Sequence, residues 1–155
     1  MSSFAQCVTT MNSRCLTEEH MTTLVKVLDK FLKEHFERAA ERQLKRKDED
    51  YDEVVEEELL GEDDTDVFLL SKVADILRSL LSIYKQDFFP YFDQLLPHFA
   101  TLLQADRPWP DHQWALCVFD DIIEYGGPGC VRYQEYFLQR MMELRVSVDG
   151  ACVCH

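Results

Sequence analysis

The residue types that could do chemistry are concentrated in one acidic segment. Residues 48–66 hold twelve of the chain's twenty-nine acidic residues and none of its sixteen basic residues. Asp48, Asp50 and Asp52 have the spacing of the first ligands of an EF-hand calcium loop, but the sixth position, which requires glycine, is Glu53, and the twelfth is a leucine. We therefore predict no metal site. Two interpretations remain open: a solvated acidic loop, or a surface that attracts a basic partner segment.

Ten residues are candidates for contact with a partner protein. Eight are acidic residues between Asp48 and Glu58, and two are tryptophans further along the chain. An indole ring can stack on a ligand, or it can pack where two helices turn. Pro108 and Pro110 restrict the loop around the first tryptophan, and both interpretations stay open. The candidates are Asp48, Glu49, Asp50, Asp52, Glu53, Glu56, Glu57, Glu58, Trp109 and Trp114.

No set of side chains has the pattern of a catalytic or cofactor site. Asp120 and Asp121 are adjacent, and neighbouring positions of a helix point about 100° apart, so the two carboxylates do not face one substrate atom. The sequence contains no phosphate-binding loop and no nucleophile motif in a strand–turn–helix context. We therefore expect no enzymatic activity, no catalytic residue and no cofactor.

The spacing of the cysteines indicates neither a zinc site nor disulfide bonds. Cys152, Cys154 and His155 resemble part of a zinc site but lack a second pair of ligands. They also fit a terminal prenylation box formally, although histidine is atypical in its last place. The six cysteines form no disulfide framework and the N-terminus has no secretory pattern, so we expect reduced thiols in the cytoplasm and nucleus.

The overall charge and hydropathy exclude two classes of partner. The net charge is −13, whereas a nucleic-acid-binding protein needs a basic face that neutralises phosphates. No uncharged apolar run reaches the length of about 18 residues that a membrane span requires. We therefore expect neither direct nucleic-acid binding nor membrane insertion.

Apolar residues recur at helical spacing along most of the chain, and glycine and proline are scarce, which predicts an all-α domain. We expect an irregular lead-in over 1–16, a helical domain over 17–144 and an irregular tail over 145–155. Within the domain, the acidic insert 48–66 should be mostly mobile because like charges oppose compaction, with Gly61 breaking any helical turn and Asp66 capping the next helix. The five expected helices cover about 17–47, 67–84, 90–105, 111–125 and 130–144.

The third and fifth expected helices align with a shift of 42 residues. Repeats of about forty residues built from helix pairs are typical of HEAT and armadillo solenoids, in which stacked neighbours cover each helix on both sides. The alignment therefore predicts an α-solenoid of HEAT-repeat helix pairs with an acidic loop insertion. The aligned pairs are Tyr91 with Tyr133, Leu95 with Phe137, Leu96 with Leu138, and Phe99 with Met141.

Four sequence elements carry a resemblance to a known family. They are DVFLLSKVADIL at 66–77, FDQLLP at 92–97, RPWPDHQW at 107–114 and CVFDDIIE at 117–124. Together they resemble the C-terminal half of a karyopherin-β nuclear import receptor of the importin-β3 type, over about residues 18–144. The acidic insert also looks like a feature of that family.

The resemblance implies a superhelix of HEAT repeats that binds basic cargo proteins or import signals, FG nucleoporins and the GTPase Ran. The chain is much shorter than such a receptor, and the N-terminal repeats through which the family chiefly engages Ran have no counterpart in it. After Leu144 the helical pattern breaks, and we therefore expect a truncated or alternatively spliced product. We therefore expect a protein-binding scaffold that imports basic cargo. The alternative is a truncated structural or regulatory fragment that competes for receptor partners.

Overall fold

The computed structural model describes residues 6–7 and 16–152, with side chains described as far as Met142. Within these residues the chain is helical and has no strand, which confirms the predicted all-α class. None of the described helices combines the length and apolar character that crossing a membrane requires. The long helices are α2 (Glu18–Lys45), α3 (Glu53–Tyr84), α4 (Phe89–Leu102), α5 (Trp109–Gly126) and α6 (Val131–Cys152), with short 3-10 helices η1 (Lys85–Phe88) and η2 (Gly127–Cys130) between them.

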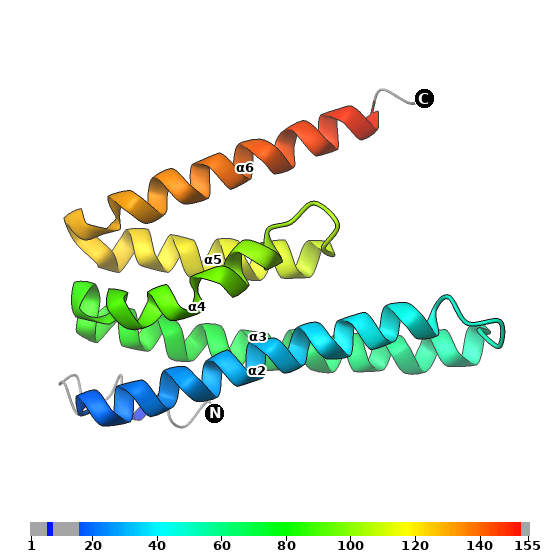
Figure 1. The fold of residues 1–155 in the computed structure, drawn as a ribbon, viewed down its shortest axis with the longest axis horizontal. Coiled ribbons are helices and arrows are strands. Elements are labelled where there is room, and N and C mark those ends of the chain that lie inside the picture. The colour runs from blue at the N-terminus through cyan, green and yellow to red at the C-terminus, as the bar shows by residue number, and fades with distance from the viewer. Residues whose placement is uncertain (1–5, 8–15, 153–155) are drawn as a thin grey trace.

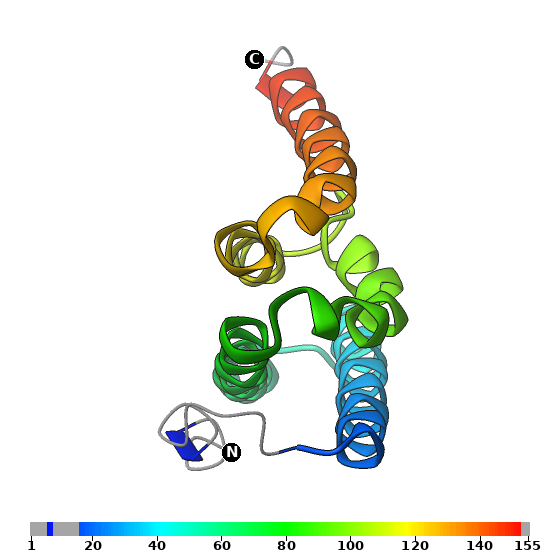
Figure 2. The ribbon, with the colours of Figure 1, turned by 90° about the vertical axis from the view of Figure 1, so that its left-hand side faces the viewer.

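The helices form two layers. Successive helices run in opposite directions (Figure 1), and α2, α4 and α6 lie in one layer while α3 and α5 lie in the other (Figure 2). The pair α4 and α5 stacks on the pair α2 and α3, and α6 packs against α5. This arrangement of stacked helix pairs confirms the predicted HEAT-repeat solenoid.

A cluster of aromatic rings fills the centre of the stack. Phe99 of α4 is fully buried and stacks on Trp114 of α5, with ring centroids 5.2 Å apart. Phe92 and Phe119 lie on other sides of Phe99, at centroid distances of 5.1 and 6.2 Å. Rings from both layers therefore hold α4 and α5 together.

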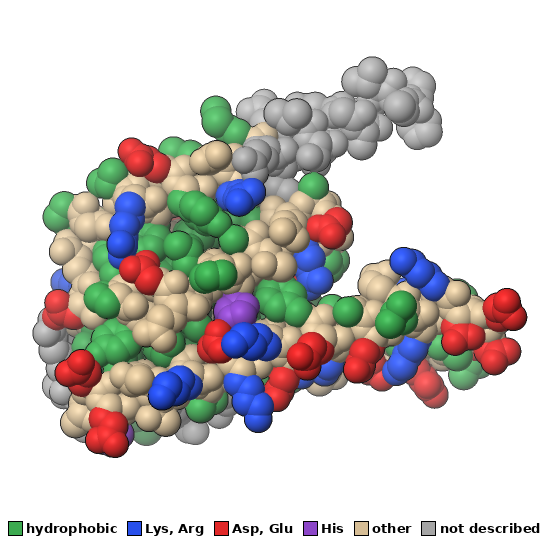
Figure 3. All heavy atoms as spheres, viewed as in Figure 1, with side chains coloured by type: hydrophobic (Ala, Val, Ile, Leu, Met, Phe, Trp, Pro, Cys, Tyr) green, Lys and Arg blue, Asp and Glu red, His purple; other side chains and the backbone are tan. Residues whose placement is uncertain are grey.

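The two helix pairs differ in length. Helices α2 and α3 have 28 and 32 residues, whereas α4 and α5 have 14 and 18. The far half of the α2–α3 hairpin consequently projects beyond the second pair (Figure 1), and a space-filling view shows a hollow at this step (Figure 3). This projection contains the acidic segment.

The prediction that the acidic insert is a mobile loop is wrong. Helix α3 begins at Glu53, where the side chain of Asp52 accepts a 2.9 Å hydrogen bond from the N–H of Val55, and it continues through Gly61 without a break. Asp66 consequently lies inside the helix and does not cap it. A glycine in a helix costs only about 1 kcal/mol relative to alanine, and basic residues of α2 compensate the acidic charges.

Two helix ends also differ from the predictions. The end of α2 was expected to project into solvent, but Arg42 is only 3% exposed because it pairs with α3. Helix α6 continues to Cys152, although an irregular tail was expected from residue 145. Residues 145–152 contain no proline, and weak apolar periodicity by itself does not end a helix. His155, Cys154 and most of the lead-in lie outside the described residues.

Gly126, the last residue of α5, allows a close approach between helices. A Cβ atom there would lie 2.5 Å from Cζ of the buried Phe89. We expect Gly126→Ala to lower the free energy of unfolding by about 1–3 kcal/mol, because Phe89 has to move. Gly61→Ala is the matched control: its Cβ would meet nothing within 4 Å, so the change should stabilise α3 by up to about 1 kcal/mol. Urea denaturation followed by circular dichroism measures both, and equal effects would contradict this account.

Candidate functional site

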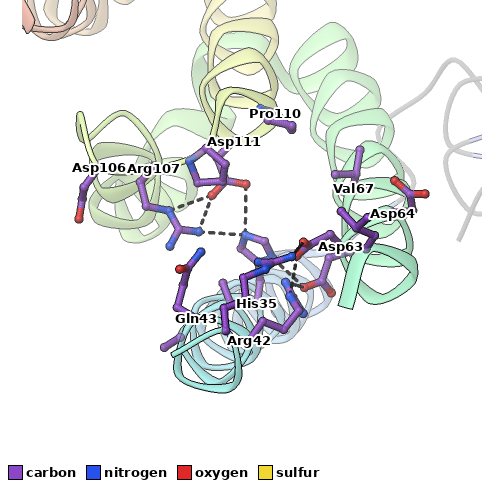
Figure 4. A pocket seen from close by; sticks show the side chains of 16 residues that line it. His35, Arg42, Gln43, Asp63, Asp64, Val67, Asp106, Arg107, Pro110 and Asp111 are labelled. Carbon is purple, nitrogen blue, oxygen red and sulfur yellow. Dashed lines mark hydrogen bonds and ion pairs between the residues drawn. The ribbon is translucent and has the colours of Figure 1, made fainter. Parts of the chain in front are cut away.

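A buried ion-pair cluster joins α2 to α3, with Asp66 at its centre. The carboxylate of Asp66 accepts hydrogen bonds from Arg38 Nε at 2.9 Å and from Arg42 Nη2 at 2.6 Å. His35 Nδ1 lies 3.3 Å from the same carboxylate. These contacts join the two helices, and Figure 4 shows His35 and Arg42 at this junction.

The same cluster reaches the loop before α5. His35 Nε2 lies 3.4 Å from Oδ1 of Asp111, and Arg107 Nε donates a 2.9 Å hydrogen bond to Oδ2 of that residue. The guanidinium of Arg107 also lies over the ring of Phe36, 5.1 Å from its centroid. The Arg107–Asp111 element that carries part of the family resemblance therefore anchors the second helix pair to the first.

Electrostatics keeps both buried carboxyl groups ionised. Burial by itself raises the pKa of Asp66, but hydrogen bonds from Arg38 and Arg42 outweigh burial and hold that pKa below its usual value. At Asp111 burial has the same effect, and His35 and Arg107 together lower the pKa. Each carboxylate is matched by cations, so the cluster has the character of a structural contact.

The acidic candidates lie at the tip and along the first turns of α3. Asp48, Glu49 and Asp50 are exposed in the turn between the helices, and Asp52 caps α3. Glu56 differs from the others because it accepts hydrogen bonds from Arg46 Nε at 3.0 Å and from the hydroxyl of Tyr51 at 2.8 Å. The remaining candidates of this group, Glu53, Glu57 and Glu58, are exposed.

The two candidate tryptophans are in different environments. Trp109 is 68% exposed at the start of α5. Trp114 is 8% exposed and stacks on Phe99 in the core, so that face of its ring is not open to a ligand. Trp114 therefore packs between helices, which was the second interpretation considered from the sequence. The structure does not bring the two tryptophans together with the acidic residues 48–50 at the tip of the hairpin.

A stripe of exposed residues follows one face of α3, and we call it the α3 stripe. Its members are spaced by three or four residues, which places them on one side of a helix, and all are exposed. Sequence reasoning found its acidic start but missed its later members, although their helical spacing was a readable signal. The α3 stripe consists of Glu53, Glu57, Leu60, Asp64, Val67 and Ser71.

The α3 stripe borders a cavity of about 500 Å³ at the step between the helix pairs. Leu60, Asp64 and Val67 of α3 line it, opposite Gln43 of α2 and Pro110 of α5 (Figure 4). No three potential metal-ligating side chains come together in the described part of the chain. The lining also includes the basic residues Arg42, Arg46 and Arg107, so the walls of the hollow carry charges of both signs, whereas the charged residues of the exposed α3 stripe at its edge are all acidic.

Comparison with known proteins supports the resemblance found in the sequence. The family model for importin repeat 6 matches residues 1–105. The chain is also 25% identical to importin subunit beta-3 of Saccharomyces cerevisiae over 149 residues, which is 96% of this chain and 13% of that relative. The chain thus spans only a small part of the length of this relative. Because the family model covers more than half of the chain, the chain belongs to the importin repeat 6 family, an importin-β-type family of HEAT-repeat proteins.

Proposed function

We propose that this chain is a protein-binding segment of a nuclear transport receptor, and that the exposed acidic residues of α3 bind basic segments of cargo proteins. Importin-type transport receptors are not enzymes. The observation that carries the proposal is the ordered acidic face of α3, whose exposed carboxylates are held on a continuous helix. On this account the chain works in the cytoplasm and nucleus. FG nucleoporins and Ran are further partners that the resemblance implies for a full-length receptor.

The distribution of ion pairs supports this role. The acidic residues that face α2 are matched, as in the contacts of Asp63 with Arg42 and Arg46 at 2.6 and 2.7 Å. Glu53, Glu57 and Asp64 of the α3 stripe make no ion pair with any described residue. Their unmatched charge attracts a basic segment and speeds its association.

A binding measurement tests the proposal. We expect a short lysine-rich peptide to bind the chain, and binding should weaken as salt rises from about 50 to 300 mM because exposed charges are screened. Neutralising four exposed acidic residues should weaken binding at least about tenfold, since four exposed pairs at about 0.2–1 kcal/mol each sum to about 1–4 kcal/mol. Fluorescence anisotropy measures the affinity. The variant combines Glu53→Gln, Glu57→Gln, Glu58→Gln and Asp64→Asn.

The matched control removes the same amount of charge elsewhere and should leave the affinity nearly unchanged. A glutamate-rich peptide should not bind. Equal weakening by both variants would show that net charge, rather than the α3 face, attracts the peptide. Absence of binding to the lysine-rich peptide at low salt would refute the proposal. The control combines Glu37→Gln, Asp120→Asn, Glu124→Gln and Glu135→Gln, all on exposed positions.

One observation favours the alternative role of a regulatory segment that competes for receptor partners. Helix α6 exposes Leu138 and Met142, at 58% and 71%, on its described part. Exposed apolar side chains of this size suit contact with another protein. A competition assay separates the two roles. A competitor for receptor partners reduces the transport of cargo by a full-length receptor. A segment that only binds cargo instead forms a complex with the cargo.

A further inference from the structure

We propose that His35 is a proton-operated joint between the two helix pairs. When its ring is neutral, Nε2 accepts a hydrogen bond from Arg107, and when the ring is protonated, Nε2–H donates to Asp111 instead. The exchange changes how the pair α2 and α3 is held to the pair α4 and α5. It is independent of any binding of cargo.

The ring of His35 is buried where three parts of the fold meet. On one side, Nδ1 lies 3.3 Å from Oδ2 of Asp66 of α3. On the other side, Nε2 lies 3.4 Å from Oδ1 of Asp111 of α5 and 3.4 Å from Nη2 of Arg107, in the loop before α5 (Figure 4). The second nitrogen therefore has two neighbours of opposite charge.

The partners of the ring determine which nitrogen carries hydrogen in the neutral state. An ionised carboxylate only accepts hydrogen bonds, so Nδ1 must carry the hydrogen in its contact with Asp66. A neutral imidazole has one N–H, which leaves Nε2 as an acceptor. A guanidinium only donates, and Nη2 of Arg107 is the donor within reach of Nε2. In this state the lone pair of Nε2 forms no bond with Asp111.

A proton on Nε2 reverses these roles. Nε2–H can then donate to Oδ1 of Asp111, whereas the imidazolium and the guanidinium of Arg107 repel each other as like charges. Arg107 stays on Asp111, because both Nε and Nη2 donate to its Oδ2. The guanidinium consequently withdraws from the ring toward the cavity of about 500 Å³ that it lines. Protonation thus replaces a contact through Arg107 by a direct contact of α2 with α5.

The charges around the ring favour the neutral state at rest. Four carboxylates and four guanidinium groups are paired on and behind His35, so a proton adds one uncompensated positive charge in buried surroundings. Histidine side chains ordinarily gain a proton between about pH 8 and pH 5, so mild acid is the condition for the exchange. The paired groups are those of Glu56, Asp63, Asp66 and Asp111 and of Arg38, Arg42, Arg46 and Arg107.

His98 of α4 is a matched comparison in the same protein. Its Nε2 lies 2.6 Å from Oδ1 of Asp29, so it also joins the second helix pair to α2. The carboxylate needs a hydrogen on Nε2 whether the ring is neutral or protonated, and protonation leaves this contact in place. Phe36 separates the two histidines, with ring centroids 5.6 Å from His35 and 5.9 Å from His98. Only His35 should exchange partners.

Nitrogen-15 spectra of the imidazole and guanidinium groups of the full chain test this joint from about pH 7.5 to pH 5. At pH 7.5 we expect His35 to carry hydrogen on Nδ1 and none on Nε2. As pH falls, Nε2 should gain hydrogen, and the Nε–H signal of Arg107 should shift with the same midpoint. His35→Gln keeps a donor and an acceptor but gains no proton, so it should abolish the Arg107 shift. His98→Gln should preserve that shift.

Four results would overturn the proposal. They are hydrogen on Nε2 of His35 at pH 7.5, a ring that keeps a single N–H down to pH 5, an Arg107 signal that does not follow His35, and an Arg107 shift that persists in His35→Gln. The first three are read on the unaltered protein and do not depend on the folding of a variant. A histidine with a purely structural role would leave the Arg107 signal unchanged.

Discussion

Replacing Asp66 with alanine should lower the free energy of unfolding by about 3–5 kcal/mol. The carboxylate holds Arg42, which is 3% exposed, and it also binds Arg38 and His35. Removing one partner of a buried ion pair is strongly destabilising because it leaves an uncompensated charge in the interior. Urea denaturation followed by circular dichroism measures the loss.

Asp64→Ala is the control for this change, because Asp64 is exposed on the same helix and makes no ion pair with a described residue. Its effect should stay within about 0.5 kcal/mol. Equal effects of the two substitutions would contradict the conclusion that the ion pairs of Asp66 stabilise the fold.

Low pH should destabilise the fold through the same ion-pair cluster. The pKa of Asp66 is lower in the folded chain than in the unfolded chain, so the unfolded state binds more protons as pH falls. This contribution to stability is complete above the unfolded pKa of about 3.9 and is lost as pH falls through the folded value. Asp66→Asn should therefore lose less stability than the wild type between about pH 5 and pH 2. Parallel losses would show that Asp66 does not contribute to the acid sensitivity.

Replacing Phe99 with alanine should cost about 3–5 kcal/mol of unfolding free energy, because a large, fully buried ring leaves a cavity behind. Phe99 contacts Phe92 within α4, and Trp114 and Phe119 of α5, so its loss weakens the contact between the two layers. Thermal or urea denaturation measures the change. The emission of Trp114 should also shift to longer wavelength as water reaches the ring.

Phe68→Ala provides the comparison for this substitution. Phe68 is 59% exposed on α3, and its ring lies near Nζ of Lys72 at 5.1 Å from the ring centroid. We expect a loss of about 1 kcal/mol or less, because little apolar surface returns to water. A loss as large as that of Phe99→Ala would contradict the assignment of Phe99 to the core.

The helix pairs were predictable from the sequence because their signal is local. Apolar residues at helical spacing define α2, α4 and α5, and Pro90 and Pro108 lie near where the last two begin. The acidic half of α3 was not predicted, because its charges are compensated by residues distant in the chain, as Asp66 is by Arg42. A signal for this pairing exists: Arg38 and Arg42 of α2 and Arg46, which caps its C-terminal end, are spaced by four residues and so lie on one face.

The candidate site was predicted only in part. Charge density alone singled out Glu53 and Glu57, and the structure places them on the exposed α3 stripe. Val67 and Asp64 were missed because their exposure results from the short second helix pair, which leaves the projecting hairpin uncovered. Trp114 was a candidate for stacking, but its burial depends on contact with Phe99, which no local pattern reveals.

Backbone amide spectra, recorded while a lysine-rich peptide is added to the chain, report on the acidic face of α3 residue by residue. We expect helical chemical shifts from Glu53 through Asp66 before peptide is added. The titration should then produce shift changes that concentrate on Glu57, Asp64 and Val67 and fade as salt rises. Random-coil shifts over the acidic segment, or changes spread evenly over the exposed acidic residues of the chain, would contradict the proposal that this ordered acidic face binds a basic segment.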